Sequence, residues 1–330
     1  MNQPATKPEM MGASKNTTAI FYEDVINGLQ SCPKRLNSKY FYDANGDKLF
    51  QELMNCPEYY PTKCELDIFS NKTAALAQSI IADGDGFDLI ELGAGDAMKS
   101  SYLLKYLLEQ QADFKYLPID ISSSVVNYLT VKLPLTLPGL QITGLNGEYF
   151  EMLTKAASLS GRRKVVLFLG SNIGNMPVNE ATEFCKGLRK HLNPGDMVLI
   201  GFDLKKSPKT ILAAYNDKGG ITKKFNLNLL ARINRELNAN FDLTQFDHYA
   251  MYDPESGACK SYLISLKDQV VTIGGKENVR FIKDEYIYME ISQKFTIMQT
   301  DQMAANTDFR PVDRFFDNKK WFVDVIWMAG

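Results

Sequence analysis

The fold is decided by the stretch Phe87-Asp-Leu-Ile-Glu-Leu-Gly-Ala-Gly95. Its first six residues are mostly apolar and predict a buried strand, which Gly93 and Gly95 follow directly. Glycine lets a backbone turn sharply and approach a ligand closely. Helical periodicity then runs from about Lys99 to Gln110. A strand, a glycine turn and a helix in this order are typical of the ligand-binding unit of a doubly wound sheet, although such a turn can also lack a ligand.

The same alternation continues along the chain and predicts a parallel α/β sheet. Apolar runs predict further strands at 116–119, 140–143, 164–169 and 196–201, with one helix beginning near 122 and another over 178–192. The run at 164–169 is the most apolar, so we expect it at the centre of the sheet. Residues 312–316 and 322–327 predict a C-terminal antiparallel hairpin. The ligand crevice of such a sheet lies at the carboxyl ends of its strands.

The flanks of this core have different patterns. Residues 1–17 are polar and predict a disordered tail. Apolar residues between 20 and 30 predict one amphipathic helix, and the aromatic residues 40–42 predict a packed loop or a short strand. After Asp203, a periodic helix over 225–237 is followed by alternating segments at 248–251, 261–264 and 286–291. These segments predict a smaller antiparallel sheet, and a helix near 294–305 follows it.

Composition excludes several classes of partner. The 330 residues carry 37 Lys and Arg against 39 Asp and Glu, so the net charge of −2 provides no overall attraction to nucleic acid or to anionic membranes. No apolar run reaches the roughly 18 residues of a membrane span. Two histidines exclude a three-histidine metal site, and five scattered cysteines are typical of reduced thiols. We therefore expect a cytoplasmic monomer that binds a small molecule and no metal, nucleic acid or membrane.

The glycine turn does not match the common nucleotide fingerprints. Met98 stands where the third glycine of a dinucleotide-binding G-x-G-x-x-G would be, and no Walker A loop is present. Asp120 ends the second strand, where an acidic residue grips ribose hydroxyls in such folds, although it could instead cap the next helix. E-L-G-x-G with a strand-end Asp resembles the core of S-adenosylmethionine (SAM)-dependent methyltransferases. The predicted C-terminal hairpin fits that core, and we take SAM as the cofactor.

Several longer motifs resemble one family, the histidine-specific SAM-dependent methyltransferases. They are Phe41-Tyr-Asp-Ala-Asn-Gly46, Pro57-Glu-Tyr-Tyr-Pro-Thr62, Phe168-Leu-Gly-Ser-Asn-Ile-Gly-Asn175, Ala213-Ala-Tyr-Asn-Asp217, Phe225-Asn-Leu-Asn-Leu-Leu-Ala-Arg-Ile-Asn-Arg-Glu-Leu237 and Glu290-Ile-Ser-Gln-Lys-Phe295. The resemblance covers about residues 20–330. It implies a Rossmann-like SAM-binding core at 64–205 and 294–330, and a smaller α+β substrate domain at 18–63 and 206–293.

The resemblance also implies a cofactor site. The loop with Glu91, Gly93 and Gly95, together with Lys99, would hold the methionine part of SAM. Asp120 would accept hydrogen bonds from the ribose.

The same resemblance implies that two adjacent residues would flank the adenine. Glu148 would contact the amino group and Tyr149 the ring, where the family more often has Asp and Phe. Without the resemblance, Tyr149 is equally well explained as a core aromatic residue at the start of a helix.

For the amino-acid substrate, the resemblance implies three residues near the reacting amine. Asn175 would orient the α-amino group, with Tyr59 and Tyr215 as its partners. Taken alone, Asn175 could be a turn residue, and Tyr59 or Tyr60 could simply pack beside neighbouring prolines.

The resemblance further implies how the side chain of the substrate is held. Glu290 and Ser292 alternate on one face of a strand and would hydrogen-bond an imidazole, with Tyr42 nearby. Taken alone, Glu290 and Ser292 would be interpreted as part of a solvent-exposed face of the strand. Ser261 stands where an apolar contact to the ring, often Met, is expected.

The activity implied is transfer of methyl groups from SAM to the α-amino group of a free amino acid. L-histidine would become trimethylhistidine, as in ergothioneine biosynthesis, with release of S-adenosylhomocysteine and without a metal. Two alternatives stay open at this point: an N-methyltransferase for another amino acid or small amine, and a SAM-binding protein without catalysis.

Overall fold

The computed structural model describes residues 13–81 and 86–330, the side chains of 13–17 excepted. Residues 1–12 of the expected tail lie outside this range. Helix α1 (Ala13–Gln30) already includes residues 13–17, so that part of the tail prediction is wrong. The chain forms two compact units. Unit 1 contains Met1–Glu58, Leu212–Met251 and Lys260–Glu290, and unit 2 contains Tyr59–Ile211, Tyr252–Cys259 and Ile291–Gly330.

Unit 2 is built on a seven-stranded sheet with the order β12-β13-β6-β5-β2-β3-β4. Its strands are β2 (Phe87–Leu92), β3 (Phe114–Asp120), β4 (Leu145–Asn146), β5 (Arg163–Phe168), β6 (Met197–Asp203), β12 (Phe309–Phe316) and β13 (Phe322–Ala329). Strands β2 to β6 are parallel, whereas β13 runs antiparallel to β6 and β12 antiparallel to β13. The predicted doubly wound sheet with a C-terminal antiparallel hairpin is confirmed, and β5 lies at its centre as expected.

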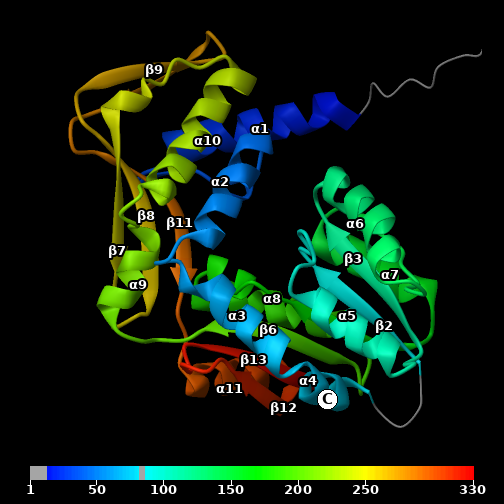
Figure 1. Ribbon diagram of the computed structural model, residues 1–330. Helices are drawn as coiled ribbons and strands as arrows, with labels where there is room; N and C mark the ends of the chain where they lie inside the picture. Colours follow the sequence, from blue (N-terminus) through cyan, green and yellow to red (C-terminus); the bar gives the residue numbers. More distant parts are fainter. Residues whose placement is uncertain (1–12, 82–85) are drawn as a thin grey trace, which may run out of the picture. The chain divides into compact units, whose positions relative to one another are not determined.

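Helices cover this sheet. They are α3 (Tyr60–Asn71), α4 (Thr73–Ile80), α5 (Ser100–Glu109), α6 (Ser123–Thr136), α7 (Tyr149–Leu159), α8 (Val178–Lys190) and α11 (Ile297–Asn306). Alternate strand residues such as Ile90, Val166 and Ile200 share one apolar cluster with α7, α8 and α11. Helix α3 contacts β13, and α6 and α7 contact β3 (Figure 1). Strands β2 and β6 are buried along their whole length, as expected for parallel strands with covered faces.

One predicted strand is wrong. The run 140–143 makes only a bridge, in which the Tyr116 amide donates to Gln141 and the Thr143 amide donates to Tyr116. At Gly144 the chain passes so close to α6 that a Cβ would lie 2.4 Å from a methyl carbon of Val126. This approach interrupts the ladder, which resumes only at β4 (Leu145–Asn146).

The strand order reverses between β2 and β5. From β2 the chain proceeds to β3 and β4 on one side, and then returns to β5 and β6 on the other. The loops after β2 and β5 therefore separate at the carboxyl edge, where open α/β sheets bind their ligands.

Unit 1 combines helices with a mixed sheet and a separate hairpin. Its helices are α1, η1 (Ser38–Phe41), α2 (Ala44–Asn55), α10 (Ile221–Leu237) and η3 (Leu243–Gln245), and α9 (Pro208–Tyr215) spans the boundary at Leu212. The sheet order is β1-β11-β8-β7, with β1 (Lys34–Arg35), β7 (Phe246–Tyr252), β8 (Ala258–Ser265) and β11 (Tyr286–Gln293). The hairpin joins β9 (Gln269–Ile273) to β10 (Glu277–Phe281), which the sequence did not predict. The aromatic residues 40–42 end a 3₁₀ helix and do not form a strand.

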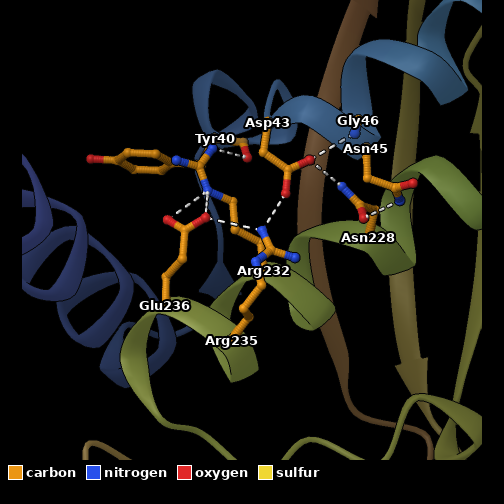
Figure 2. Close-up of polar contacts among 8 residues, drawn as sticks. All are labelled: Tyr40, Asp43, Asn45, Gly46, Asn228, Arg232, Arg235 and Glu236. Atoms are coloured by element: carbon orange, nitrogen blue, oxygen red, sulfur yellow. Dashed lines mark hydrogen bonds and ion pairs between the residues drawn. The ribbon is translucent and has the colours of Figure 1, made fainter.

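A polar cluster fixes the start of α2 against α10 in unit 1 (Figure 2). One carboxylate oxygen of Asp43 accepts from the Gly46 amide at 2.7 Å and from Asn228 Nδ2 at 2.9 Å. Its other oxygen pairs with Arg235 at 2.5 Å. Burial alone would raise the pKa of Asp43, but the hydrogen bonds from these three residues outweigh it and lower that pKa.

Candidate active site

Of the two glycines in the loop after β2, Gly95 borders open space and Gly93 does not. Gly93 and Gly95 have φ of +67° and +54°, a region that favours glycine. A Cβ on Gly93 would lie 2.8 Å from the Tyr149 hydroxyl and 3.4 Å from Asn172 Nδ2, so no side chain fits there. A Cβ on Gly95 would meet no heavy atom within 4 Å. The backbone at Gly95 therefore borders open space.

Asp120 joins this loop to the next strand. One oxygen of its carboxylate accepts from the Gly95 amide at 3.3 Å, and the other accepts from the Ser122 amide at 2.8 Å. Ser122 is the residue that caps α6, accepting from the Val125 amide, so the alternative that Asp120 is the helix cap does not hold. Burial raises the pKa of Asp120, and the backbone hydrogen bonds oppose that shift. The carboxylate stands at the carboxyl edge with capacity for further donors.

Glu148 and Tyr149 lie at the start of α7. Glu148 is exposed and makes no side-chain capping bond. The Tyr149 ring packs edge-on against Phe168 at 5.8 Å between centroids. Burial raises the pKa of Tyr149 to about 12, with smaller contributions from the charges of Asp120 and Glu148. The structure thus brings these residues together with Gly93 and Asp120.

Glu91 is a buried carboxyl on β2. The Tyr116 hydroxyl on neighbouring β3 donates to it at 2.5 Å. Burial raises the pKa of Glu91 to about 7, while hydrogen bonds from Tyr116 and Ser100 and the charge of Lys99 pull it down. Glu91 therefore changes charge near neutral pH, directly before the glycine loop.

Lys99 is held by a carboxylate that the sequence analysis did not identify. Its ammonium group pairs with Glu65 of α3, whose side chain is fully buried. Both oxygens of Glu65 also accept from the Gly170 amide, at 2.8 and 2.9 Å. The Lys99 ammonium group, just before α5, is therefore fixed beside Gly170, which stands two residues after the end of β5.

Asn175 ends a short 3₁₀ helix, η2 (Asn172–Asn175), after β5. Ser171 before it has a left-handed φ of +57°, and its hydroxyl accepts from the Asp203 amide at 3.3 Å. A Cβ on Gly174 would lie 2.9 Å from the Gln293 carbonyl oxygen, so this turn packs tightly on the chain after β11. Asn175 itself is exposed at the carboxyl edge, where the sequence predicted it.

A buried ionic network lies at the end of β6. Lys294 Nζ pairs with Asp203 at 2.7 Å and donates to Ser292 Oγ at 2.7 Å. Lys206 pairs with the other oxygen of Asp203, and the Tyr60 hydroxyl donates to Asp203 at 2.8 Å. Burial is the main reason that the pKa of Lys206 is lowered. Two cations thus share one buried carboxylate.

This network separates the roles of two adjacent tyrosines. Tyr60 is buried, and Lys206 Nζ also donates to its hydroxyl at 3.0 Å. Tyr59 is half-buried and stands immediately before α3. Tyr60 therefore serves the network.

In unit 1, Glu290 of β11 is oriented by a buried amide. Asn226 Nδ2 on α10 donates to Glu290 Oε1 at 3.3 Å and to the Thr222 carbonyl oxygen at 3.1 Å. Asn226 is fully buried, and its own oxygen has no hydrogen-bond partner among the described residues. Glu290 itself is half-buried.

The remaining predicted residues of unit 1 lie on separate elements. Tyr42 is 47% exposed and packs edge-on against Phe50 and Phe225. Tyr215 ends α9 and is buried. Ser261 on β8 is buried, and its hydroxyl has no partner among the described residues. Among the residues that the structure describes, 13–81 and 86–330, no helix is long and apolar enough to cross a membrane. In the same ranges, no group of three His, Cys, Asp or Glu side chains could hold a metal ion.

Comparison with known proteins decides the family. The model of the histidine-specific, SAM-dependent methyltransferases matches residues 21–329. The chain belongs to this family. Histidine N-alpha-methyltransferase of Mycobacterium tuberculosis is 36% identical to it, over 82% of this chain and 83% of that protein. The enzyme of the same name from Mycolicibacterium smegmatis is 34% identical, over 86% of this chain and 87% of that protein. The resemblance predicted from the motifs is confirmed.

A third relative is longer than this methyltransferase. Ergothioneine biosynthesis protein 1 of Schizosaccharomyces pombe is 28% identical over 89% of this chain but only 38% of that protein. The match therefore covers most of this chain and less than half of that larger protein.

Three residues near the predicted site were missed by the sequence analysis: Glu65, Asn226 and Lys294. Each is fully buried and polar, and each contacts a predicted site residue. Lys294 lies within the motif at 290–295, and Asn226 lies within the motif at 225–237. For Lys294 and Asn226, the sequence offered one signal: a polar residue at a position where burial is expected.

Proposed function

We propose that this methyltransferase transfers methyl groups from SAM to the α-amino group of free L-histidine, up to trimethylhistidine. The match over residues 21–329 and the names of the relatives support the reaction. The observation that carries the choice of substrate is the Glu290 carboxylate, which Asn226 orients on β11. A carboxylate suits an imidazole because the ring offers N–H donors.

The cofactor site lies at the carboxyl edge of the unit 2 sheet. Asp120 accepts hydrogen bonds from the ribose, and the open backbone at Gly95 lets the ligand approach. Glu148 receives the adenine amino group, while Tyr149 lies against the adenine. When bound, SAM supplies a methyl carbon made electrophilic by the positively charged sulfur.

The methionine part of SAM is held by the loop itself. Gly93 and Glu91 shape the turn, and Lys99 provides a cation for the carboxylate of the cofactor. Because Glu65 already fixes the Lys99 ammonium group, this cation keeps its place before the ligand arrives. Such preorganisation reduces the cost of ordering a flexible side chain on binding.

We infer that Asn175 and Tyr59 of unit 2 orient the reacting amine. The amine must attack as the neutral form, so its ammonium proton leaves before the new C–N bond forms and the C–S bond breaks. Exposure of Asn175 gives water access to receive that proton. Holding two reactants in line contributes about 7–11 kcal/mol in well-oriented systems. The main work of these residues is therefore positioning.

The imidazole is held by Glu290 and Ser292, two residues apart on β11, with Tyr42 nearby. Glu290 accepts from one ring N–H, and Ser292 contacts the other ring nitrogen. Without Glu290, a ring N–H would be left unpaired at a cost of about 1–3 kcal/mol.

Isothermal titration with a panel of amino acids, in the presence of S-adenosylhomocysteine, tests the substrate. Wild type should prefer histidine, and Glu290→Ala should lose roughly 5- to 150-fold in histidine affinity. The variant should also accept tryptophan better, because a half-buried negative charge no longer opposes an apolar ring. Glu285→Ala is the matched control, since it removes a neighbouring carboxylate that pairs with Lys34. If wild type ignores histidine, or Glu290→Ala binds it equally well, the histidine proposal fails while the family assignment stands.

A second experiment separates catalysis from structure at Asn175. Asn175→Ala should lower the rate of product formation, followed by mass spectrometry, while binding of S-adenosylhomocysteine stays nearly intact. The exposed position of Asn175 predicts little effect on folding. An equal loss of turnover and cofactor affinity would instead assign Asn175 to the structure of the turn.

A further inference from the structure

We propose that Asn172 is a further cofactor-binding residue, whose side-chain amide donates to the α-carboxylate at the methionine end of the bound cofactor. This inference rests on the proposed cofactor site, because it takes Lys99 as the cation for the same carboxylate. It goes beyond that site by adding a second donor, which the loop after β5 contributes. The residues concerned, including Gly93, Gly170 and Tyr149, all belong to unit 2.

The side chain of Asn172 is polar and unused within the part of the chain that the structure describes. Asn172 is the first residue of η2, and its backbone amide donates to the Leu169 carbonyl oxygen at 3.4 Å. Its side-chain amide makes no hydrogen bond to any residue within 13–81 and 86–330. Asn172 is half-buried, and neither polar atom of its side chain is fully buried. Both atoms are therefore accessible to a ligand or to water.

The Asn172 amide faces the same glycine as the Lys99 ammonium group. Gly170 has a left-handed φ of +77° and follows β5 by two residues. A Cβ on Gly170 would lie 3.5 Å from Lys99 Nζ and 3.7 Å from Asn172 Nδ2, and its third nearest heavy atom would be Asn172 Cγ at 3.8 Å. These are ordinary contact distances, so there is room for an atom beside Gly170. Its nearest polar neighbours there are two nitrogen donors.

The same amide also faces the glycine loop after β2. A Cβ on Gly93 would lie 3.4 Å from Asn172 Nδ2 and 2.8 Å from the Tyr149 hydroxyl oxygen. Asn172 Nδ2 therefore lies between the loops that follow β2 and β5. These are the two strands at which the strand order reverses, where open α/β sheets bind their ligands.

The free donors of this group fit an anion. Glu65 pairs with the Lys99 ammonium group, which has three N–H donors, and no other hydrogen-bond partner of Lys99 lies among the described residues. Asn172 Nδ2 adds two N–H donors that are unused there. A carboxylate has two oxygens and can accept from both nitrogens at once, and the positive charge of Lys99 strengthens such contacts. An α-ammonium group would instead need acceptors at this place.

Two reactants carry an α-carboxylate, the cofactor and the amino-acid substrate, and the position of Asn172 favours the cofactor. Its amide nitrogen lies against Gly93, in the loop proposed for the methionine part of the cofactor. Asn175, which we assign to the substrate amine, stands three residues later, or one turn further along η2. The two asparagines of this short helix thus serve different reactants.

The test compares two ligands that differ only in the carboxylate: S-adenosylhomocysteine and its decarboxylated analogue S-adenosyl-3-thiopropylamine, which keeps the amine. Both are titrated calorimetrically into the full chain without any amino acid. Asn172→Ala should lower the affinity for S-adenosylhomocysteine roughly 10-fold or more, because a hydrogen bond to a charged group is lost. Its affinity for the decarboxylated analogue should change less than about 2-fold. The ratio of the two affinities within one variant does not depend on the folded fraction of the sample.

Two further variants complete the design. Asn172→Asp keeps the shape of the side chain but offers only acceptors when ionised, so it should weaken S-adenosylhomocysteine more than Asn172→Ala does and leave the analogue bound. Asn193→Ala is the matched control, because Asn193 is an exposed asparagine before the amino end of β6, at the opposite edge of the sheet. It should change the affinity for neither ligand.

The possible outcomes separate this inference from the proposed site. Equal losses for both ligands in Asn172→Ala overturn it, since the amide would then act without the carboxylate. Unchanged affinity for S-adenosylhomocysteine overturns it too, and weaker binding of histidine in the same variant would assign the amide to the substrate carboxylate. Asp120→Ala should weaken both ligands alike through the ribose. If Asp120→Ala weakens neither ligand, the proposed ribose contact fails, whereas the ratio measured at Asn172 still decides the inference.

Discussion

At the scale of single residues, Asp120 has a structural role, and we propose that the same carboxylate binds the cofactor. It connects the Gly95 and Ser122 amides across the ends of β2 and β3. Two carboxylate oxygens offer about four acceptor sites, so two remain for further donors. The residue that shapes the loop is therefore also the one that we propose as the ribose ligand.

Replacing Asp120 should weaken cofactor binding more than folding. Asp120→Ala removes charge-assisted hydrogen bonds worth about 1.5–3 kcal/mol, equivalent to roughly 10- to 150-fold in affinity for S-adenosylhomocysteine. Titration calorimetry measures this loss directly. Ser122→Ala is the control, because it removes the cap of α6 and leaves the carboxylate in place. Equal losses in both variants would mean that Asp120 acts only through the start of α6.

Residues at strand ends could be predicted because their position follows from local pattern. Gly95, Asp120 and Asn175 each come after an apolar run, and parallel strands bring their carboxyl ends to one edge. The partners of Glu65 and Lys294 could not be predicted, because they lie far away in the chain. Glu65 pairs with Lys99, and Lys294 pairs with Asp203. Local sequence shows only that a charge is present, and tertiary contacts decide what neutralises it.

At the scale of elements, α10 was predictable from sequence and α2 was not. Helix α10 buries a regular apolar stripe that includes Phe225, Leu229 and Ile233. Helix α2 buries only Gly46 and Leu53, and its first turn contains residues that favour turns. Its start is instead fixed by Asp43, through contacts to α10 that have no local signal (Figure 2).

Loss of the Asp43 cap should therefore destabilise α2. Asp43→Ala removes a helix cap worth about 0.5–2 kcal/mol and leaves Asn228 and Arg235 without this acceptor. The free energy of unfolding from urea titration should fall by about 2 kcal/mol. Asp43→Asn keeps an acceptor for the Gly46 amide and should lose less than half as much. Equal losses would show that the charge pair with Arg235 matters more than the cap.

At the scale of the whole molecule, buried ionisable groups make stability depend on pH in two directions. Burial lowers the pKa of His248 to about 4, so its neutral form stabilises the fold above the unfolded pKa near 6.5, and this contribution is lost as pH falls through 4. Burial raises the pKa of Glu91 to about 7. A raised carboxyl pKa costs stability as pH rises from the unfolded value toward the folded one. At mildly acidic pH, neither the loss of stability from His248 nor the loss from Glu91 is complete.

Asp324 on β13 should add to the loss of stability at higher pH. It is fully buried, neither carboxylate oxygen has a hydrogen-bond partner among the described residues, and burial raises its pKa well above the usual value, with the charge of Glu65 adding to the shift. A Cβ on Gly201 would lie 2.3 Å from a Glu65 oxygen and 3.1 Å from an Asp324 oxygen, so the two acids share one small space.

Asp324→Asn should therefore stabilise the protein, increasingly so as pH rises above about 4. The amide carries no charge and can donate to the Glu65 carboxylate, so the cost of keeping a proton on Asp324 disappears. The gain in the free energy of unfolding should be near zero at about pH 4 and on the order of 1–3 kcal/mol at about pH 8, measured by urea unfolding across that range. Asp313→Asn, on the exposed side of neighbouring β12, should change stability little at any pH. A loss of stability in Asp324→Asn that is the same at all pH values would mean that this carboxyl is already ionised in the folded protein, with a partner that the amide cannot replace.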